Sequence, residues 1–77
     1  MTKEQLKDIL ENSLKNCTAD IQSDDNVHFS GTIVAEEFND IKSKVKRQQL
    51  VYSKINDYIA SGELHAFSMK TIAKNEI

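Results

Sequence analysis

The sequence predicts a single α+β domain with the element order α-β-β-α-α-β, in which a three-stranded mixed sheet carries the two main helices on one face. Three observations support this fold class. The spacing of apolar residues changes from helical to alternating and back again along the chain. Turn-forming residues separate two consecutive strand patterns. Helical patterns stand between the second and third strand patterns, which favours a right-handed crossover and therefore a parallel pairing. A length of 77 residues accommodates one domain, residues 1–77.

The first predicted element is a helix of about three turns. Thr2 and Gln5 have the spacing of a capping box, in which each side chain bonds a free backbone amide at the start of a helix. The apolar residues that follow recur at helical spacing and form one stripe: Leu6, Ile9, Leu10 and Leu14.

An antiparallel hairpin is predicted next. Residues 17–22 alternate between apolar and polar side chains, as a half-buried strand does, with Cys17, Ala19 and Ile21 facing inward. Residues 23–26 are a polar turn. The second strand, residues 27–35, is expected to turn four apolar side chains to the core: Val27, Phe29, Ile33 and Ala35. Gly31 interrupts this face and indicates a bulge or a close approach of two backbones.

The remainder of the chain predicts two helices and a strand. Residues 36–41 are expected to form a single helical turn, and Ser43 is a suitable N-cap for a longer helix. The apolar stripe of that helix is predicted to comprise Val51, Ile55, Tyr58 and Ile59, with Leu50 on its flank. Gly62 suits the left-handed position that ends a helix. Residues 64–72 are predicted to form the last strand, followed by a short polar tail.

Composition excludes several classes of protein. A net charge of -2 argues against general coating of nucleic acid. No apolar stretch approaches the length of a membrane span and no signal segment is visible, so we expect a cytoplasmic protein without membrane contact. Two glycines cannot build a glycine-rich phosphate loop, and no serine lies in a nucleophile elbow, so catalysis is not expected. The single cysteine, Cys17, is expected to be a small buried apolar residue, in a reducing compartment, and not a ligand or a nucleophile.

His28 and His65 are the first candidate functional residues. Each is predicted to begin a strand, and parallel pairing of those strands would place both residues at the same end of the sheet. Imidazole is a common ligand for soft or borderline metals, but two imidazoles cannot fill a coordination shell. The alternative is that the two histidines are half-exposed and unrelated.

A basic segment at the start of the long helix is the second candidate. Four of its six residues are cationic: Lys42, Lys44, Lys46 and Arg47. Clustered charge at a helix start can contact phosphates, and helix-turn-helix geometry is one way into the major groove of DNA. The alternative is a solvated segment that aids solubility.

Several runs of residues resemble the BolA family, in particular its short bacterial branch. These are the runs Lys46-Arg47-Gln48-Gln49-Leu50-Val51-Tyr52 and Ser61-Gly62-Glu63-Leu64-His65-Ala66-Phe67-Ser68-Met69-Lys70-Thr71, together with His28-Phe29 and Glu37-Phe38. The resemblance implies a fold similar to a class II KH domain. The Gly-x-x-Gly loop that clamps RNA in KH domains is absent, so RNA binding of that kind is not expected.

The resemblance also implies a function without catalysis. BolA-like proteins associate with monothiol glutaredoxins and share a [2Fe-2S] cluster, to which the glutaredoxin contributes a cysteine and a glutathione thiolate. By this resemblance His65 would be one ligand and His28 a second, in a protein for iron-sulfur handling or for redox and iron regulation. Imidazole in place of thiolate removes negative charge and raises the potential of such a cluster. The free protein is expected to be a monomer or a weak homodimer.

Two other functions remain open. Founding members of the family are linked to DNA binding and transcription regulation, which here maps onto Lys42, Lys44, Lys46 and Arg47. In a third interpretation the chain is a stress-response protein that acts through protein contacts alone.

Overall fold

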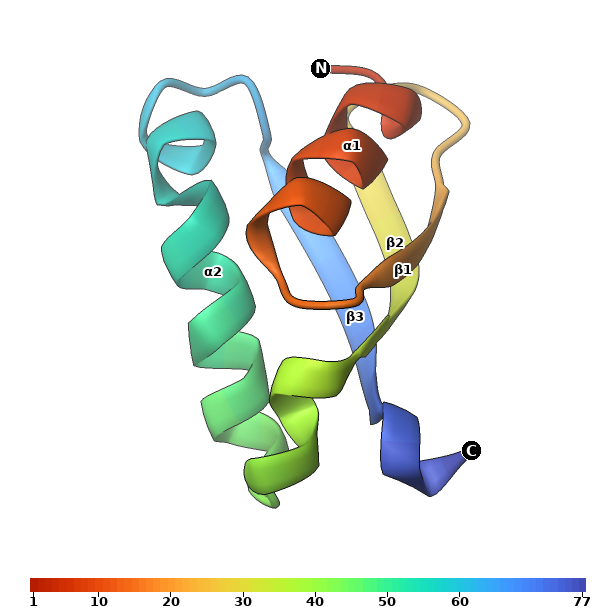
Figure 1. Cartoon of the computed structure of the whole chain (residues 1–77). Helices are drawn as coiled ribbons and strands as arrows, with labels where there is room; N and C mark the ends of the chain where they lie inside the picture. The colour runs from red at the N-terminus through yellow and green to blue at the C-terminus, as the bar shows by residue number, and fades with distance from the viewer.

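The computed structural model describes all 77 residues and confirms the predicted element order (Figure 1). It contains the helices α1 (Lys3–Ser13) and α2 (Lys44–Ala60), the strands β1 (Thr18–Gln22), β2 (His28–Ala35) and β3 (Ala66–Ala73), and the short 3-10 helices η1 (Glu36–Asp40) and η2 (Lys74–Glu76). The predicted polar tail is therefore partly helical. Neither main helix combines the length and the apolar character needed to cross a membrane.

The three strands form one mixed sheet in the order β1-β2-β3. β1 and β2 are antiparallel, with Ala19 opposite Ile33, and β2 and β3 are parallel, with His28 opposite Ala66. The chain returns from β2 to β3 through η1 and α2, as the sequence predicts.

The core lies between one face of the sheet and the two helices, and α2 runs along most of the molecule (Figure 1). Side chains alternate between buried and exposed along each strand, because successive residues point to opposite faces. Fourteen apolar residues are buried together: Leu6, Leu10, Leu14, Ala19, Ile21, Phe29, Ile33, Ala35, Phe38, Val51, Ile55, Leu64, Phe67 and Ala73. The opposite face of the sheet is open, with Ser30 and Ser68 exposed on it.

Local signals set the helix ends where the sequence predicts them. Thr2 and Gln5 form a reciprocal capping box at the start of α1, with bonds of 2.8 and 3.2 Å. Ser43 caps α2 by accepting the backbone amide of Lys46 at 3.3 Å. Gly62 has a φ of +82°, which is the left-handed conformation expected where α2 ends.

Gly31 marks a close approach and not a bulge. β1 and β2 pair residue for residue across this position, with Gly31 opposite Ile21. A Cβ at position 31 would lie 2.7 Å from Ile21 Cδ1 and 2.9 Å from the carbonyl oxygen of Asp20. Glycine is therefore needed here for space.

Two predicted core residues are exposed instead. Val27 lies in the turn, where its amide bonds the carboxylate of Asp25, and 39% of the residue is exposed. Ile59 is also 39% exposed, because Tyr58 is the residue of the last helical turn that packs against the core. In addition, β3 begins at Ala66, so His65 precedes the strand.

Candidate functional site

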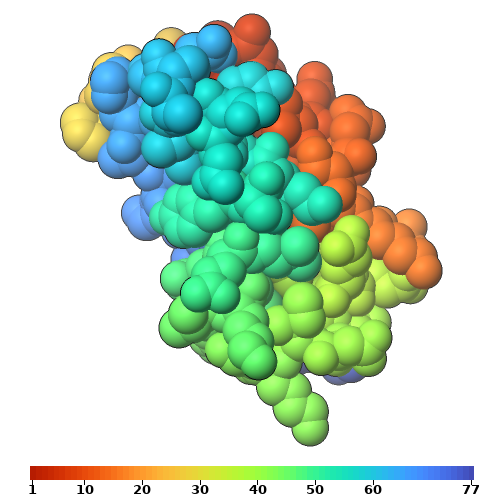
Figure 2. Space-filling view, turned by 90° about the vertical axis from the view of Figure 1, so that its left-hand side faces the viewer, coloured from red at the N-terminus to blue at the C-terminus, as the bar shows by residue number.

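The two histidines lie at the same end of the sheet. His28 begins β2 opposite Ala66, and His65 is the residue before Ala66. Neighbouring strands are about 4.8 Å apart, so the backbone segments that carry the two imidazoles are adjacent. The turn between β1 and β2 and the loop before β3 lie together at one end of the molecule in Figure 2. Both histidines are exposed.

The imidazole of His28 is held by a carboxylate from the turn. Nδ1 of His28 lies 2.9 Å from Oδ2 of Asp25, while Oδ1 of Asp25 accepts the backbone amides of Val27 and His28, each at 2.9 Å. Hydrogen bonds from the His28 ring, and then from these two amides, hold the pKa of Asp25 well below its usual range. Asp25 is therefore ionised and can only accept hydrogen bonds.

The two imidazoles do not by themselves form a metal site. His28 lies on the open face of the sheet, where a hollow of about 220 Å³ also touches Ser30 and Ser68. His65 lies in a loop, outside the lining of that hollow. Nowhere in the chain do three or more side chains of the types His, Cys, Asp and Glu converge in a way that could hold a metal ion. A metal ion bound by these imidazoles would therefore need its other ligands from a second molecule.

Cys17 is less buried than the sequence predicts. It is half-buried against the core. Burial, with further contributions from the carboxylates of Glu11 and Glu37, raises the pKa of its thiol to about 11. A thiol with so high a pKa is a poor nucleophile and a poor metal ligand near neutral pH.

The lysines of the basic segment lie at the other end of the molecule. Lys42, Lys44 and Lys46 are exposed near the start of α2, whereas His65 follows the end of that helix and His28 lies at the same end of the sheet as His65. A helix of 17 residues rises about 25 Å, so α2 separates the two candidate surfaces along the long axis of the molecule. Figure 1 shows both the β1–β2 turn and the loop before β3 at the opposite end from the start of α2.

Arg47 does not belong to the exposed basic surface, which corrects the prediction that it contacts nucleic acid. Its guanidinium is buried, bonds the carboxylate of Glu76 at 2.8 Å and lies over the ring of Phe38. It also donates to three backbone carbonyls, those of Ile41, Phe38 and Thr71. The sequence contained a signal for this: Arg47 precedes Val51 by four residues and so lies on the apolar stripe of α2.

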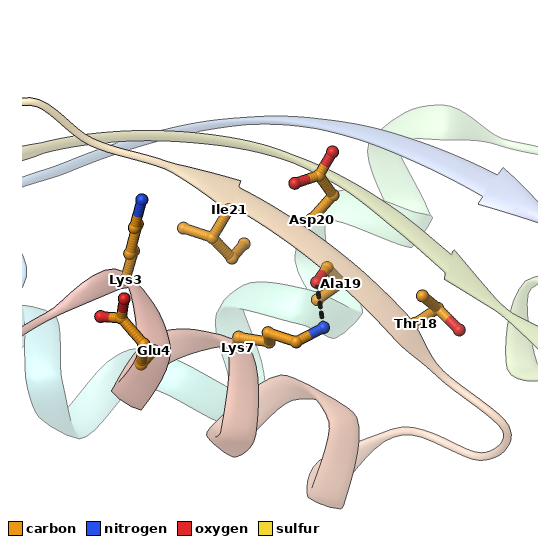
Figure 3. A pocket seen from close by; sticks show the side chains of 7 residues that line it. All are labelled: Lys3, Glu4, Lys7, Thr18, Ala19, Asp20 and Ile21. Carbon is orange, nitrogen blue, oxygen red and sulfur yellow. Dashed lines mark hydrogen bonds between the residues drawn. The ribbon is translucent and has the colours of Figure 1, made fainter.

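The outer edge of β1 is a feature that sequence patterns did not reveal. Lys7 of α1 donates to the carbonyl of Ala19 at 2.9 Å, and Glu11 accepts the amide of Ala19 at 3.0 Å. Figure 3 shows Lys7 reaching across the hollow between α1 and β1, which has a volume of about 290 Å³. Since exposed strand edges invite pairing with other chains, this pair of side chains blocks part of the edge.

The fold and its two ends define a small α+β domain with one imidazole-bearing end and one lysine-rich end. The family model described as BolA-like protein matches residues 2–76. The chain therefore belongs to the BolA-like family, as the resemblance of its motifs implies.

Relatives and solved structures agree with this assignment. The chain is 37% identical over 76 residues to a protein from the rpoN-murA intergenic region of Acinetobacter guillouiae, covering 99% of this chain and 89% of that protein. It is 34% identical over 76 residues to the acid stress protein IbaG of Escherichia coli K12, covering 99% and 88% respectively. The structure of a BolA homologue from Coxiella burnetii superposes with a TM-score of 0.85 at 25% identity, covering 99% of this chain and 95% of that one.

Proposed function

We propose that this chain binds a monothiol glutaredoxin and, without being an enzyme itself, shares a [2Fe-2S] cluster with it. The observation that carries the proposal is the parallel register of β2 and β3, which sets two exposed histidines at one end of the sheet. Two imidazoles complement a partner that supplies two thiolates, one from its cysteine and one from glutathione. A [2Fe-2S] cluster takes four ligands besides its bridging sulfides, two on each iron, so neither the two imidazoles nor the two thiolates alone complete the site.

His65 and His28 have distinct roles in this proposal. His65 is exposed in the loop before β3, where it is accessible to a partner. His28 is held by Asp25 at Nδ1, and its side chain is nevertheless 74% exposed. A bound cluster would supply electron-transfer chemistry, and the chain's own contribution would be two neutral donors that change its charge and its dependence on pH.

The test is titration of the chain into a monothiol glutaredoxin that carries the cluster, followed by visible absorption and circular dichroism. We expect the cluster spectrum to change on mixing, and His65→Ala to abolish that change. Glu63→Ala is the matched control, because it alters an exposed side chain of the same loop without removing an imidazole. If His65→Ala and His28→Ala both leave the spectrum and lifetime of the cluster unchanged while binding persists, the chain acts through protein contacts alone.

The proposal includes a role in the response to acid stress, because the two histidines that would bind the cluster are sensitive to pH. The relative from Escherichia coli carries the name acid stress protein. A protonated imidazole cannot bind iron, so a cluster held by histidines is released as pH falls. Repeating the titration between pH 8 and pH 5 should therefore show weaker cluster sharing at the acidic end.

DNA binding in transcription regulation is the second candidate function, and it is favoured by the exposure of Lys42, Lys44 and Lys46. Contacts with phosphates would make affinity fall steeply with salt, with a log–log slope of about -0.9 per phosphate contacted. Changing these three lysines to glutamine should abolish a mobility shift, whereas Lys54→Gln, an exposed change further along α2, should preserve it. A shift that survives the triple change excludes this surface.

A further inference from the structure

The turn that precedes His28 is braced around a single carboxylate. Ser23 Oγ accepts the amide of Asn26 at 3.0 Å and donates to the carbonyl of His28 at 2.8 Å. Asn26 adopts a φ of +57°, which turns the chain back toward β2. Inside this turn one oxygen of Asp25 accepts two backbone amides, and the other oxygen is left free to bind the ring of His28.

The contact with the ring is not needed to close the turn. The amides of Val27 and His28 are satisfied by Oδ1 of Asp25 alone. Oδ2 makes an additional bond, to Nδ1 of an imidazole whose side chain is 74% exposed. At so exposed a position, water could bond both Oδ2 of Asp25 and Nδ1 of His28. The bond between them is therefore not needed to satisfy a buried polar atom, and its effect is to orient the ring.

The pairing determines which ring nitrogen carries the proton. An ionised carboxylate only accepts hydrogen bonds, so Nδ1 of His28 must be the donor. In the neutral ring the second nitrogen, Nε2, is then unprotonated and available as a metal ligand. An unconstrained imidazole favours the opposite arrangement, with the proton on Nε2. Metal-binding histidines commonly have such a carboxylate at the nitrogen that does not bind the metal.

We propose that Asp25 is a positioning residue, which holds His28 as the Nδ1–H tautomer and presents Nε2 to the iron of a shared cluster. This inference rests on the proposed function, since it assigns a purpose to one of its two ligands. His65 has no carboxylate bonded to its ring, so the two histidines differ in how far each is prepared for metal binding.

The first test uses the free protein and needs neither partner nor cluster. Long-range proton–nitrogen spectra of uniformly labelled protein at pH 8 report the tautomer of each ring. We expect the proton of His28 on Nδ1 in the natural chain and mainly on Nε2 in Asp25→Ala. Asp25→Asn can still accept the two backbone amides through its oxygen, which leaves its NH2 group facing the ring as a donor, so the proton of His28 should lie mainly on Nε2 in this variant too.

Asp24→Ala is the matched control, because it removes the neighbouring carboxylate of the same turn, which makes no bond to His28. The amide signals of β1 and β2 show in each variant whether the hairpin is intact. A natural chain with the proton of His28 on Nε2 would overturn the proposal, as would a tautomer that Asp25→Ala does not change.

The second test measures the consequence for the cluster. With cluster-loaded glutaredoxin, Asp25→Ala should weaken sharing about 10-fold to 100-fold, which is the usual effect of removing a carboxylate behind a metal-binding histidine. Asp25→Asn should weaken sharing to a similar extent, and Asp24→Ala should leave it unchanged. If His28→Ala weakens sharing but Asp25→Ala does not, positioning is refuted while the proposed function stands. If neither histidine variant has any effect, the proposed function fails, whatever the tautomer.

Discussion

Substituting alanine for Arg47 removes a guanidinium that joins four segments of the chain. The side chain is 3% exposed and donates to the carbonyl of Ile41 at 2.6 Å, to that of Phe38 at 3.3 Å and to that of Thr71 at 3.4 Å. It also pairs with Glu76 of η2 at 2.8 Å. Alanine would leave these carbonyls without their donor and open a cavity beneath α2.

The expected loss is large for so small a domain. A buried acceptor left without its partner costs about 1–3 kcal/mol. The ion pair adds little, because the side chain of Glu76 is 47% exposed. Allowing for water that enters the cavity, we expect Arg47→Ala to lower the free energy of unfolding by about 3–5 kcal/mol. Domains are stable by about 0.05–0.15 kcal/mol per residue, so the variant should be close to unfolding.

Urea unfolding followed by far-ultraviolet circular dichroism measures this loss. With an m-value of about 1 kcal/mol/M, the midpoint should fall by about 3 M or more. Arg47→Lys retains the charge but cannot span all the carbonyls, so it should lose about 2 kcal/mol and remain folded. Lys46→Ala, an exposed neighbour, should stay within about 0.5 kcal/mol of the natural chain. If both Arg47 variants unfold at the same urea concentration as the natural chain, the reasoning is refuted.

Three further predictions concern glycine, acid stability and helix capping. Gly31→Ala should lower the free energy of unfolding by about 1–3 kcal/mol, because the new Cβ would press against the backbone of β1. Gly62→Ala should lower it by about 1 kcal/mol, because residue 62 has a φ of +82° although its new Cβ would meet no atom. Thermal unfolding of the two variants measures both losses of stability, and equal losses would argue against a close approach of the β1 and β2 backbones at Gly31. Hydrogen bonds from the amide of Ala73 and from a guanidinium lower the pKa of Glu76, so its contribution to stability is full above pH 4.5 and is lost as pH falls. Glu76→Gln should therefore flatten the acid side of a plot of urea midpoint against pH, and an unchanged slope would contradict this. Thr2→Ala should lower the free energy of unfolding by about 1 kcal/mol through loss of the capping box, whereas Lys3→Ala, an exposed change in the first turn of α1, should have little effect.

Much of the histidine end was accessible to sequence reasoning, but its detail was not. The alternating pattern and the crossover rule together place His28 and His65 at one sheet end, because both depend on general rules of strand geometry. The bond between Asp25 and His28 is different. They are only three positions apart in the sequence, yet their meeting depends on the turn geometry set by Ser23 and the positive φ of Asn26.

By itself, the sequence determined the order of the elements, the helix caps and the inward faces of the strands. These features arise from short-range physics: the capping box of Thr2 and Gln5 spans one turn of helix, and the strand patterns repeat every second residue. Only the tertiary structure decided which partners hold the buried guanidinium of Arg47, and that Lys7 and Glu11 close the edge of β1. Those outcomes depend on segments that meet only after folding, such as Arg47 with Glu76, 29 positions later in the chain. Whether a charged side chain can be buried depends on the partners that it finds in the fold, and these partners lie far from it in the sequence.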